Sequence, residues 1–160
     1  MSLTASAAIW FLPFVTPICF YVAYTDMKSM KITNQAVLAL FGVFAFIGLI
    51  ALPFEDYLWR YVHVIVALLA GMALNAVNAM GAGDAKFIAA AAPFVALADI
   101  PEILVLFAGV LLVAFCAHRL VKRSPLRQLA PDWESWHLSR DFPMGLALGP
   151  TLVAYLGMSL

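Results

Sequence analysis

Hydrophobic positions along the chain fall into six runs separated by short polar segments. The runs lie near residues 5–25, 36–54, 60–79, 86–98, 102–120 and 143–160. A transmembrane helix needs about 20 mainly apolar residues, and most of the runs approach this length. The fourth run is shorter and contains Pro93, so we expect its helix to be tilted, broken or buried among its neighbours. The pattern therefore predicts an all-α polytopic membrane protein with six transmembrane helices.

The amino-acid composition agrees with a membrane protein. The chain is 65% hydrophobic and 11% charged, whereas a soluble domain is about 45–50% apolar and about 25% charged. A soluble domain of this length would leave large apolar patches in water, so the lipid bilayer is the expected surrounding. The formal net charge of +0 does not provide the strongly basic face that nucleic acid would require, and no nucleic-acid partner is expected.

Loop charges predict the orientation of the helices, because loops rich in lysine and arginine stay in the cytoplasm. The loops after the first, third and fifth runs are basic, and the intervening loops are acidic. The basic positions are Lys28, Lys31, Lys86, Arg119, Lys122, Arg123, Arg127 and Arg140, and the acidic positions are Glu55, Asp56, Asp99 and Glu102. Both termini are therefore predicted to be extracytoplasmic.

The longest polar segment, residues 121–142, is expected to be a cytoplasmic interfacial loop within a single membrane domain of residues 1–160. It mixes basic residues with Trp133 and Trp136, a composition that suits the membrane–water interface. Such a loop could act as a lid or as a docking surface for a substrate. The alternative is a solvated loop with an aromatic anchor.

Two aspartates, Asp26 and Asp84, lie at the predicted cytoplasmic membrane face in the similar tetrads TDMK and GDAK. An ionisable side chain costs about 2.5–3.5 kcal/mol at the centre of a membrane helix, so acids at membrane depth indicate a functional site. The alternative is that Asp26 merely ends a helix and that Asp84 is an N-cap. Gly81 and Gly83 favour a functional site, since they allow close backbone approach or a positive φ beside Asp84.

Paired carboxylates suit the hydrolysis of a peptide bond. When two acids share a proton, one can take a proton from water while the other donates one to the carbonyl oxygen. Helix ends predict Asp84, at a helix N-terminus, as the anion and Asp26, near a helix C-terminus, as the neutral acid. The chain contains no H-E-x-x-H or G-x-S-x-G motif, and its histidines have no metal-ligand spacing. We therefore expect no metal and no organic cofactor.

These residues resemble the type IV prepilin peptidases, which are membrane aspartyl proteases of the G-x-G-D class. The segment GAGDAK at 81–86 matches the family's G-x-G-D-x-K motif. The segment YTDMKSMKITN, from Tyr24 to Asn34, is similar to the first family motif, with Thr33 where proline is usual. The segment FPMGLALGP at 142–150 is similar to the opening of the family's last helix.

The resemblance implies an aspartic-type endopeptidase of the cell inner (cytoplasmic) membrane. Its substrate would be a prepilin or pseudopilin, whose leader peptide it removes at the cytoplasmic face with Asp26 and Asp84 as the catalytic pair. The other candidate site residues are Gly81, Gly83 and Lys86 as motif support, and Lys28 and Asn34 as substrate contacts. The chain has no C-x-x-C pair, so the resemblance implies the small branch of the Flp pilus type, without a methyltransferase domain. Archaeal preflagellin peptidases share the class and are an alternative.

Two other functions fit the same acids. In a small transporter or channel they would relay protons or bind a cation, and further polar residues would line a path. Asn75 and Asn78, near the inner end of the third run, could begin such a path. A non-catalytic assembly subunit that kept the fold is the third alternative, and only activity separates it from the peptidase.

Overall fold

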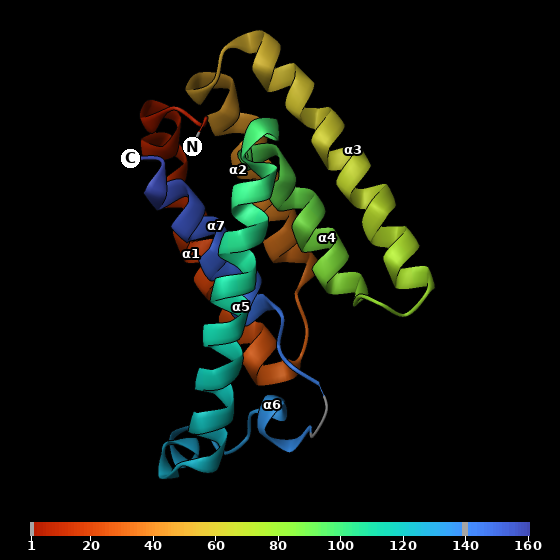
Figure 1. Cartoon of the computed structure of the whole chain (residues 1–160), viewed down its shortest axis with the longest axis vertical. Coiled ribbons are helices and arrows are strands. Elements are labelled where there is room, and N and C mark those ends of the chain that lie inside the picture. Colours follow the sequence, from red (N-terminus) through yellow and green to blue (C-terminus); the bar gives the residue numbers. More distant parts are fainter. Residues whose placement is uncertain (1, 139–140) are drawn as a thin grey trace.

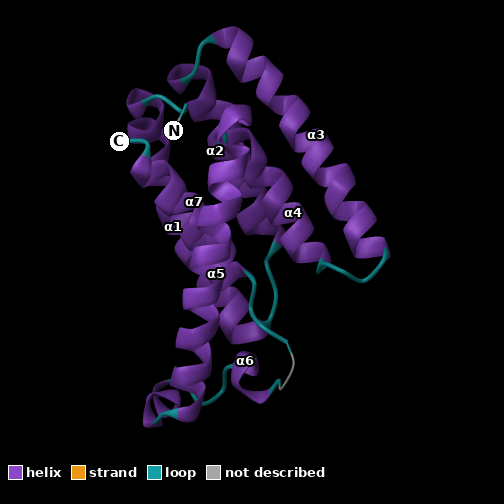
Figure 2. Ribbon diagram, viewed as in Figure 1, coloured by secondary structure: helices purple, strands orange, loops and turns teal. Residues whose placement is uncertain are grey.

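The computed structural model describes residues 2–138 and 141–160, and the elements in these ranges are helical (Figure 2). The α-helices are α1 (Ala5–Ser29), α2 (Asn34–Ala51), α3 (Phe54–Ala76), α4 (Ala82–Ala91), α5 (Ile100–Arg123), α6 (Glu134–His137) and α7 (Gly145–Met158). The 3₁₀ segments are η1 (Ala92–Phe94), η2 (Leu97–Asp99) and η3 (Pro125–Leu129). The prediction of an all-α fold is confirmed.

Four helical segments among the described residues are long and apolar enough to cross a membrane. They are Ala5–Ser29, Asn34–Ala51, Phe54–Ala76 and Leu97–Arg123. The remaining apolar helices are shorter, with 10 residues in α4 and 14 in α7. At 1.5 Å per residue these helices measure about 15 and about 21 Å, against a hydrocarbon core of about 30 Å. The chain is thus suited to a membrane, and the count of six spans stays a prediction.

Some helices extend beyond the apolar runs, and charged residues occupy these extensions. Glu55 and Asp56, which the sequence placed in a loop, lie in the first turn of α3. Lys122 and Arg123, expected in the interfacial loop, form part of the last turn of α5. Acidic residues near a helix N-terminus and basic residues near a C-terminus are stabilised by the helix dipole. Lys86 also lies within a helix, α4, so the loop assignments were wrong at these positions.

The fourth predicted helix is short and breaks near Pro93, as expected. α4 ends at Ala91 and continues as η1, which contains Pro93. Proline lacks a backbone N–H and cannot continue the hydrogen-bond ladder of an α-helix. Phe87 and Phe94 are 1% and 0% exposed. This segment is therefore buried among its neighbours.

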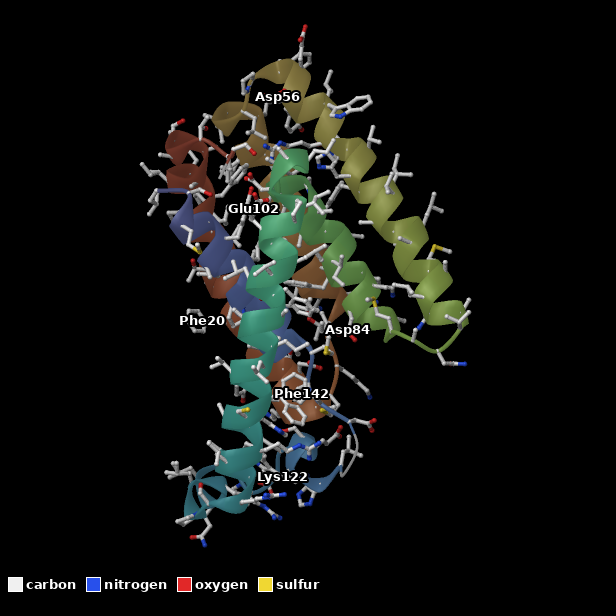
Figure 3. All side chains as sticks on the ribbon, in the orientation of Figure 1. Phe20, Asp56, Asp84, Glu102, Lys122 and Phe142 are labelled. Carbon is white, nitrogen blue, oxygen red and sulfur yellow. The ribbon has the colours of Figure 1, made fainter. Side chains whose placement is uncertain are left out.

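The acidic residues Asp56 and Glu102 and the basic residue Lys122 lie toward opposite ends of the helix array. Both termini lie at one end (Figure 1). Asp56 and Glu102 lie toward this end, whereas Lys122 lies at the opposite end (Figure 3). The arrangement matches the alternation of acidic and basic loops in the sequence. Arg140, one of the predicted basic positions, lies outside the described residues.

Small residues allow the helices that carry the candidate site to approach closely. A Cβ atom on Gly149 of α7 would lie 2.8 Å from the carbonyl oxygen of Cys19 in α1. A Cβ atom on Gly71 of α3 would lie 2.8 Å from the Cβ of Ala85 in α4. Such contacts are typical of helices that pack in membranes. They hold α7 against α1 and α4 against α3.

Candidate active site

Asp26 lies in the last turn of α1 and is held by the start of α7. Its side chain is 5% exposed, and Oδ2 accepts a 2.6 Å hydrogen bond from the backbone N–H of Gly145. Gly145 is the first residue of α7, where backbone N–H groups have no intrahelical partner and the helix dipole is positive. The start of α7 therefore fixes the Asp26 carboxyl group and favours its negative charge.

Asp84 lies in the first turn of α4, whose N-cap is Gly81. The alternative that Asp84 is itself the N-cap is therefore wrong. Its carboxylate accepts a hydrogen bond from the backbone N–H of Gly81, a contact by which an acidic residue in the first turn supports a helix start. A Cβ atom on Gly81 would lie 2.7 Å from Oδ2 of Asp84. A larger residue at this position would thus displace the carboxylate.

The two aspartates line one pocket of about 280 Å³. Its walls come from three segments that are far apart in the chain: Asp26 with residues 30–32, residues 81–84, and Phe142 with Met144. Figure 3 shows Asp84 near the start of α4, with Phe142 on the segment that leads into α7. The structure therefore brings together both acidic motifs and the opening of the last helix.

Gly83 allows the two acidic motifs to meet. A Cβ atom on Gly83 would lie 3.3 Å from the Cβ of Ile32, which follows α1. From the sequence, Gly81 and Gly83 were expected either to allow a close approach of the backbone or to adopt a positive φ. Close approach is the one found, because Gly81 has a φ of −66° and no described glycine has a positive φ.

Burial and the neighbouring acid perturb Asp84, which lies outside the four candidate spans. Burial and the negative charge of Asp26 raise the pKa of Asp84 to about 6, and the hydrogen bond from Gly81 acts in the opposite direction. Two neighbouring carboxyl groups that interact in this way do not both ionise readily, and such a pair is able to share a proton. Proton sharing is what acid–base chemistry at such a pair requires.

The helix ends lie where the sequence predicted them, with Asp26 near the C-terminus of α1 and Asp84 near the N-terminus of α4. The dipole of α4 favours the anionic form of Asp84. Burial and the charge of Asp26 act in the opposite direction and raise the pKa of Asp84. The assignment of the proton to Asp26 stays a prediction.

Lys86 and Asn34 connect the two motif regions. The Lys86 ammonium donates a 3.1 Å hydrogen bond to Oδ1 of Asn34, the first residue of α2. The Thr33 side chain caps this helix by accepting a hydrogen bond from the backbone N–H of Ala36. Thr33 therefore stabilises the start of α2 at the position where the resemblance led us to expect proline.

Lys28 and Lys31 have different surroundings. The Lys28 ammonium lies 5.8 Å from the ring centroid of Tyr24 and does not belong to the pocket lining. Lys31 does line the pocket, and sequence reasoning did not single it out for the site. Its signal was its place in the first acidic motif, five positions after Asp26. The roles of Lys28 and Asn34 as substrate contacts stay predictions.

Phe142, Met144 and Gly145 are site residues whose roles the sequence did not reveal. Their segment was noted only for its resemblance to the opening of the family's last helix. Phe142 packs edge-to-face on His118 at a centroid distance of 5.6 Å, and His118 stacks on Trp136 at 5.0 Å. These aromatic contacts anchor the chain between α5 and α7 beside the pocket.

The candidate chemistry uses two carboxyl groups, Asp26 and Asp84. Within residues 2–138 and 141–160, no group of three or more His, Cys, Asp or Glu side chains could hold a metal ion. The two acids, the backbone N–H of Gly145 and a pocket open to a substrate are the parts that could polarise a water molecule and an amide.

Comparison with known protein families finds a match to one family. The model of the type IV leader peptidase family matches residues 13–118. Asp26 and Asp84 both lie inside the matched region, and Gly145 lies beyond it. No curated protein and no solved structure matches the chain.

Proposed function

The chain belongs to the type IV leader peptidase family, and from this premise we propose that it is an aspartic-type endopeptidase that removes the leader peptide of prepilins or pilin-like proteins. One observation carries the proposal: Asp26 and Asp84, from separate helices, line the same pocket. Acids placed in this way match the paired carboxylates that hydrolyse amides by sharing a proton.

In the proposed mechanism, the ionised acid takes a proton from a water molecule as the oxygen attacks the carbonyl carbon of the scissile bond. The protonated acid donates its proton to the carbonyl oxygen, which gives a neutral tetrahedral intermediate. The acid that took the proton from water then donates it to the leaving nitrogen, and the other acid takes a proton from a hydroxyl group of the intermediate. The carbon–nitrogen bond breaks, and the pair returns to its original protonation. Positioned acid–base groups of this kind each contribute about 10²–10⁴-fold to a rate.

Gly145 is proposed to position Asp26 throughout this cycle. Its N–H contributes a hydrogen bond that favours the carboxylate form. Gly81 does the same for Asp84. Each acid therefore has its own backbone donor, so small differences in burial and substrate contact decide where the shared proton lies.

The proposed substrate fits the side of the membrane on which the pocket is expected. A basic leader stays in the cytoplasm for the same reason that basic loops do. The site is proposed to face the cytoplasm at the inner membrane, with the scissile bond just before the hydrophobic pilin helix. Lys31, in the pocket lining, belongs to the basic side of the molecule. We assign the chain to the Flp pilus type, with preflagellin-like substrates as the alternative.

The structure gives Asn75 and Asn78, the two residues that suggested a transport path, a role in a turn instead. Asn75 donates a 2.8 Å hydrogen bond to the carbonyl oxygen of Met80, and Asn78 adopts a left-handed conformation with a φ of 56°. Both residues therefore shape the turn between α3 and α4. Their roles favour the peptidase over the transporter.

The test is to co-express the chain with a candidate prepilin and to follow the size of the precursor. We expect leader removal with the wild type and none with Asp26→Ala or Asp84→Ala. Immunodetection of each variant in the membrane fraction controls for expression. Cleavage that persists in both variants would rule out the aspartyl mechanism, and cleavage by neither wild type nor variants, across several prepilin and preflagellin precursors, would point to the non-catalytic subunit.

A further inference from the structure

A second pocket lies at the end of α5 and is separate from the two acids. It has a volume of about 430 Å³ and is lined by Lys122, Arg123, Ser124, Arg127, Gln128 and Pro131. Half of these lining residues are positively charged and none is negatively charged. None of them lines the pocket that contains Asp26 and Asp84. We call this feature the basic pocket.

The basic pocket lies where a segment capable of crossing the membrane ends. The candidate span Leu97–Arg123 ends inside it, and Figure 3 shows Lys122 at the opposite end of the molecule from Asp56. The chain then continues as η3, which places Arg127 in the same pocket as Lys122 and Arg123 of α5. In a membrane, the cations at this end of the span would lie at the level of the lipid headgroups.

The positive charges of the basic pocket have no counter-charge in its lining. Lys122 donates a 2.7 Å hydrogen bond to the carbonyl oxygen of Leu138, a contact that satisfies a donor but neutralises no charge. Like charges gathered at one place repel one another. A bound anion would relieve this repulsion, and a volume of about 430 Å³ falls in the range of ligand pockets.

Exposed leucines next to the cations indicate what kind of anion would bind. Leu126 and Leu129 of η3 are 57% and 84% exposed. Burying such side chains in lipid is favourable, and leaving them in water is not. A phospholipid would match both features, because its phosphate group would contact the cations and its hydrocarbon chains would contact the leucines. A soluble phosphate compound would make no use of Leu126 and Leu129.

We propose that the basic pocket binds the phosphate group of an anionic phospholipid, with the acyl chains along Leu126 and Leu129. Because Lys122 also holds the carbonyl of Leu138, the bound lipid would brace the segment that contains α6. The proposal concerns lipid binding and does not depend on the peptidase activity.

The test uses the purified full-length protein in detergent and native mass spectrometry to count bound lipid. Phosphatidylglycerol is compared with phosphatidylcholine for the wild type and for the double variant Arg123→Gln/Arg127→Gln. Both substituted side chains are exposed, so the fold should persist, and circular dichroism checks this. The control variant, Lys28→Gln/Lys86→Gln, removes the same charge at exposed positions outside the pocket lining.

We expect one tightly retained phosphatidylglycerol on the wild type and on the control variant. Binding to the double variant should be about 30-fold weaker, because each cation near an anionic lipid contributes about 1 kcal/mol. Glycerol 3-phosphate should not compete. Equal binding to both double variants, equal retention of phosphatidylcholine, or competition by glycerol 3-phosphate would each overturn the proposal, and the last result would assign the pocket to a soluble phosphate.

Discussion

The backbone N–H of Gly145 and the carboxylate of Asp26 form a 2.6 Å hydrogen bond across 119 positions of the chain. This contact joins the start of α7 to the end of α1, and its acceptor is the carboxyl group that would act in the proposed reaction. It also explains why glycine begins α7, since a Cβ atom there would lie 3.0 Å from the Cβ of Asp26 and 3.1 Å from Oδ2. The position of the first acid therefore depends on a segment that follows both acidic motifs.

Substitution of Gly145 by alanine should lower activity without unfolding the protein. The added methyl group would push the Asp26 carboxylate by a few tenths of an ångström. A misplacement of about 1 Å costs about 10²-fold in rate, so for a few tenths of an ångström we expect a loss of about three- to tenfold in kcat. The measurement is the cleavage rate of a purified precursor by Gly145→Ala.

Gly157→Ala is the matched control, because it lies in the same helix and has nothing within 4 Å of the added Cβ. It should cleave at the wild-type rate. Equal rates for Gly145→Ala and the wild type would show that the contact with Asp26 does not position a reacting group.

The sequence predicted the helical class, the break at Pro93 and the proximity of the two acidic motifs. Hydropathy placed the α3 boundary late, because Glu55 and Asp56 are polar yet suit a helix N-terminus. A hydropathy pattern gives the length of the apolar part of a helix. The helix itself extends as far as its backbone hydrogen bonds continue, including through polar residues. Charged residues at helix ends therefore account for the differences.

The contributions of Phe142, Met144 and Gly145 could not be predicted. Their place in the pocket depends on how α7 packs against α1, and that packing is decided by small residues such as Gly149 beside Cys19. A single sequence shows where the small residues are, but it does not show which neighbouring helix each of them contacts. The resemblance of the segment to a family motif was the only available signal.

The raised pKa of Asp84 should depend on Asp26. Burial and the charge of Asp26 raise the pKa of Asp84 to about 6. Asp26→Asn removes the charge and leaves the burial, so the pKa of Asp84 should fall while staying above its ordinary value. The protonated form of Asp84 should then disappear at a lower pH than in the wild type. Infrared spectroscopy of the protonated carboxyl band, titrated with pH, measures this shift.

Asp84→Asn identifies the band, which should be absent from that variant. Asp56→Asn is the control, because Asp56 lies at the top of Figure 3, well away from Asp84, and should leave the titration unchanged. An unchanged or raised pKa of Asp84 in Asp26→Asn would mean that the two acids do not interact.

Lys86 and Asn34 should act as one unit. Their hydrogen bond of 3.1 Å is exposed, and exposed contacts to a charged group contribute about 0.2–1 kcal/mol. We therefore expect Lys86→Met and Asn34→Ala each to lower kcat/KM about threefold, with no further loss in the double variant. A double-mutant cycle on purified protein measures the coupling. Additive losses would indicate that Lys86 or Asn34 contacts the substrate separately.

Lys31 and Glu55 should lie on opposite sides of the membrane. α2 connects the regions of these residues and is a candidate span. Single cysteines at Lys31 and Glu55, in a background without Cys19 and Cys116, can be labelled with a membrane-impermeant reagent on intact cells. Glu55→Cys should react and Lys31→Cys should react only after lysis. Asp132→Cys should behave like Lys31→Cys, and the reverse pattern would invert the proposed orientation.

The proton-sharing pair is the centre of the account, and isosteric substitution tests it most directly. Single-turnover cleavage of a purified precursor in liposomes is to be measured for Asp26→Asn, Asp84→Asn and the double variant. The account predicts that each single substitution lowers the rate by about 10³-fold or more and that the double variant is no slower than either, because the two acids act as a unit. A single variant that cleaves at close to the wild-type rate would contradict the central claim.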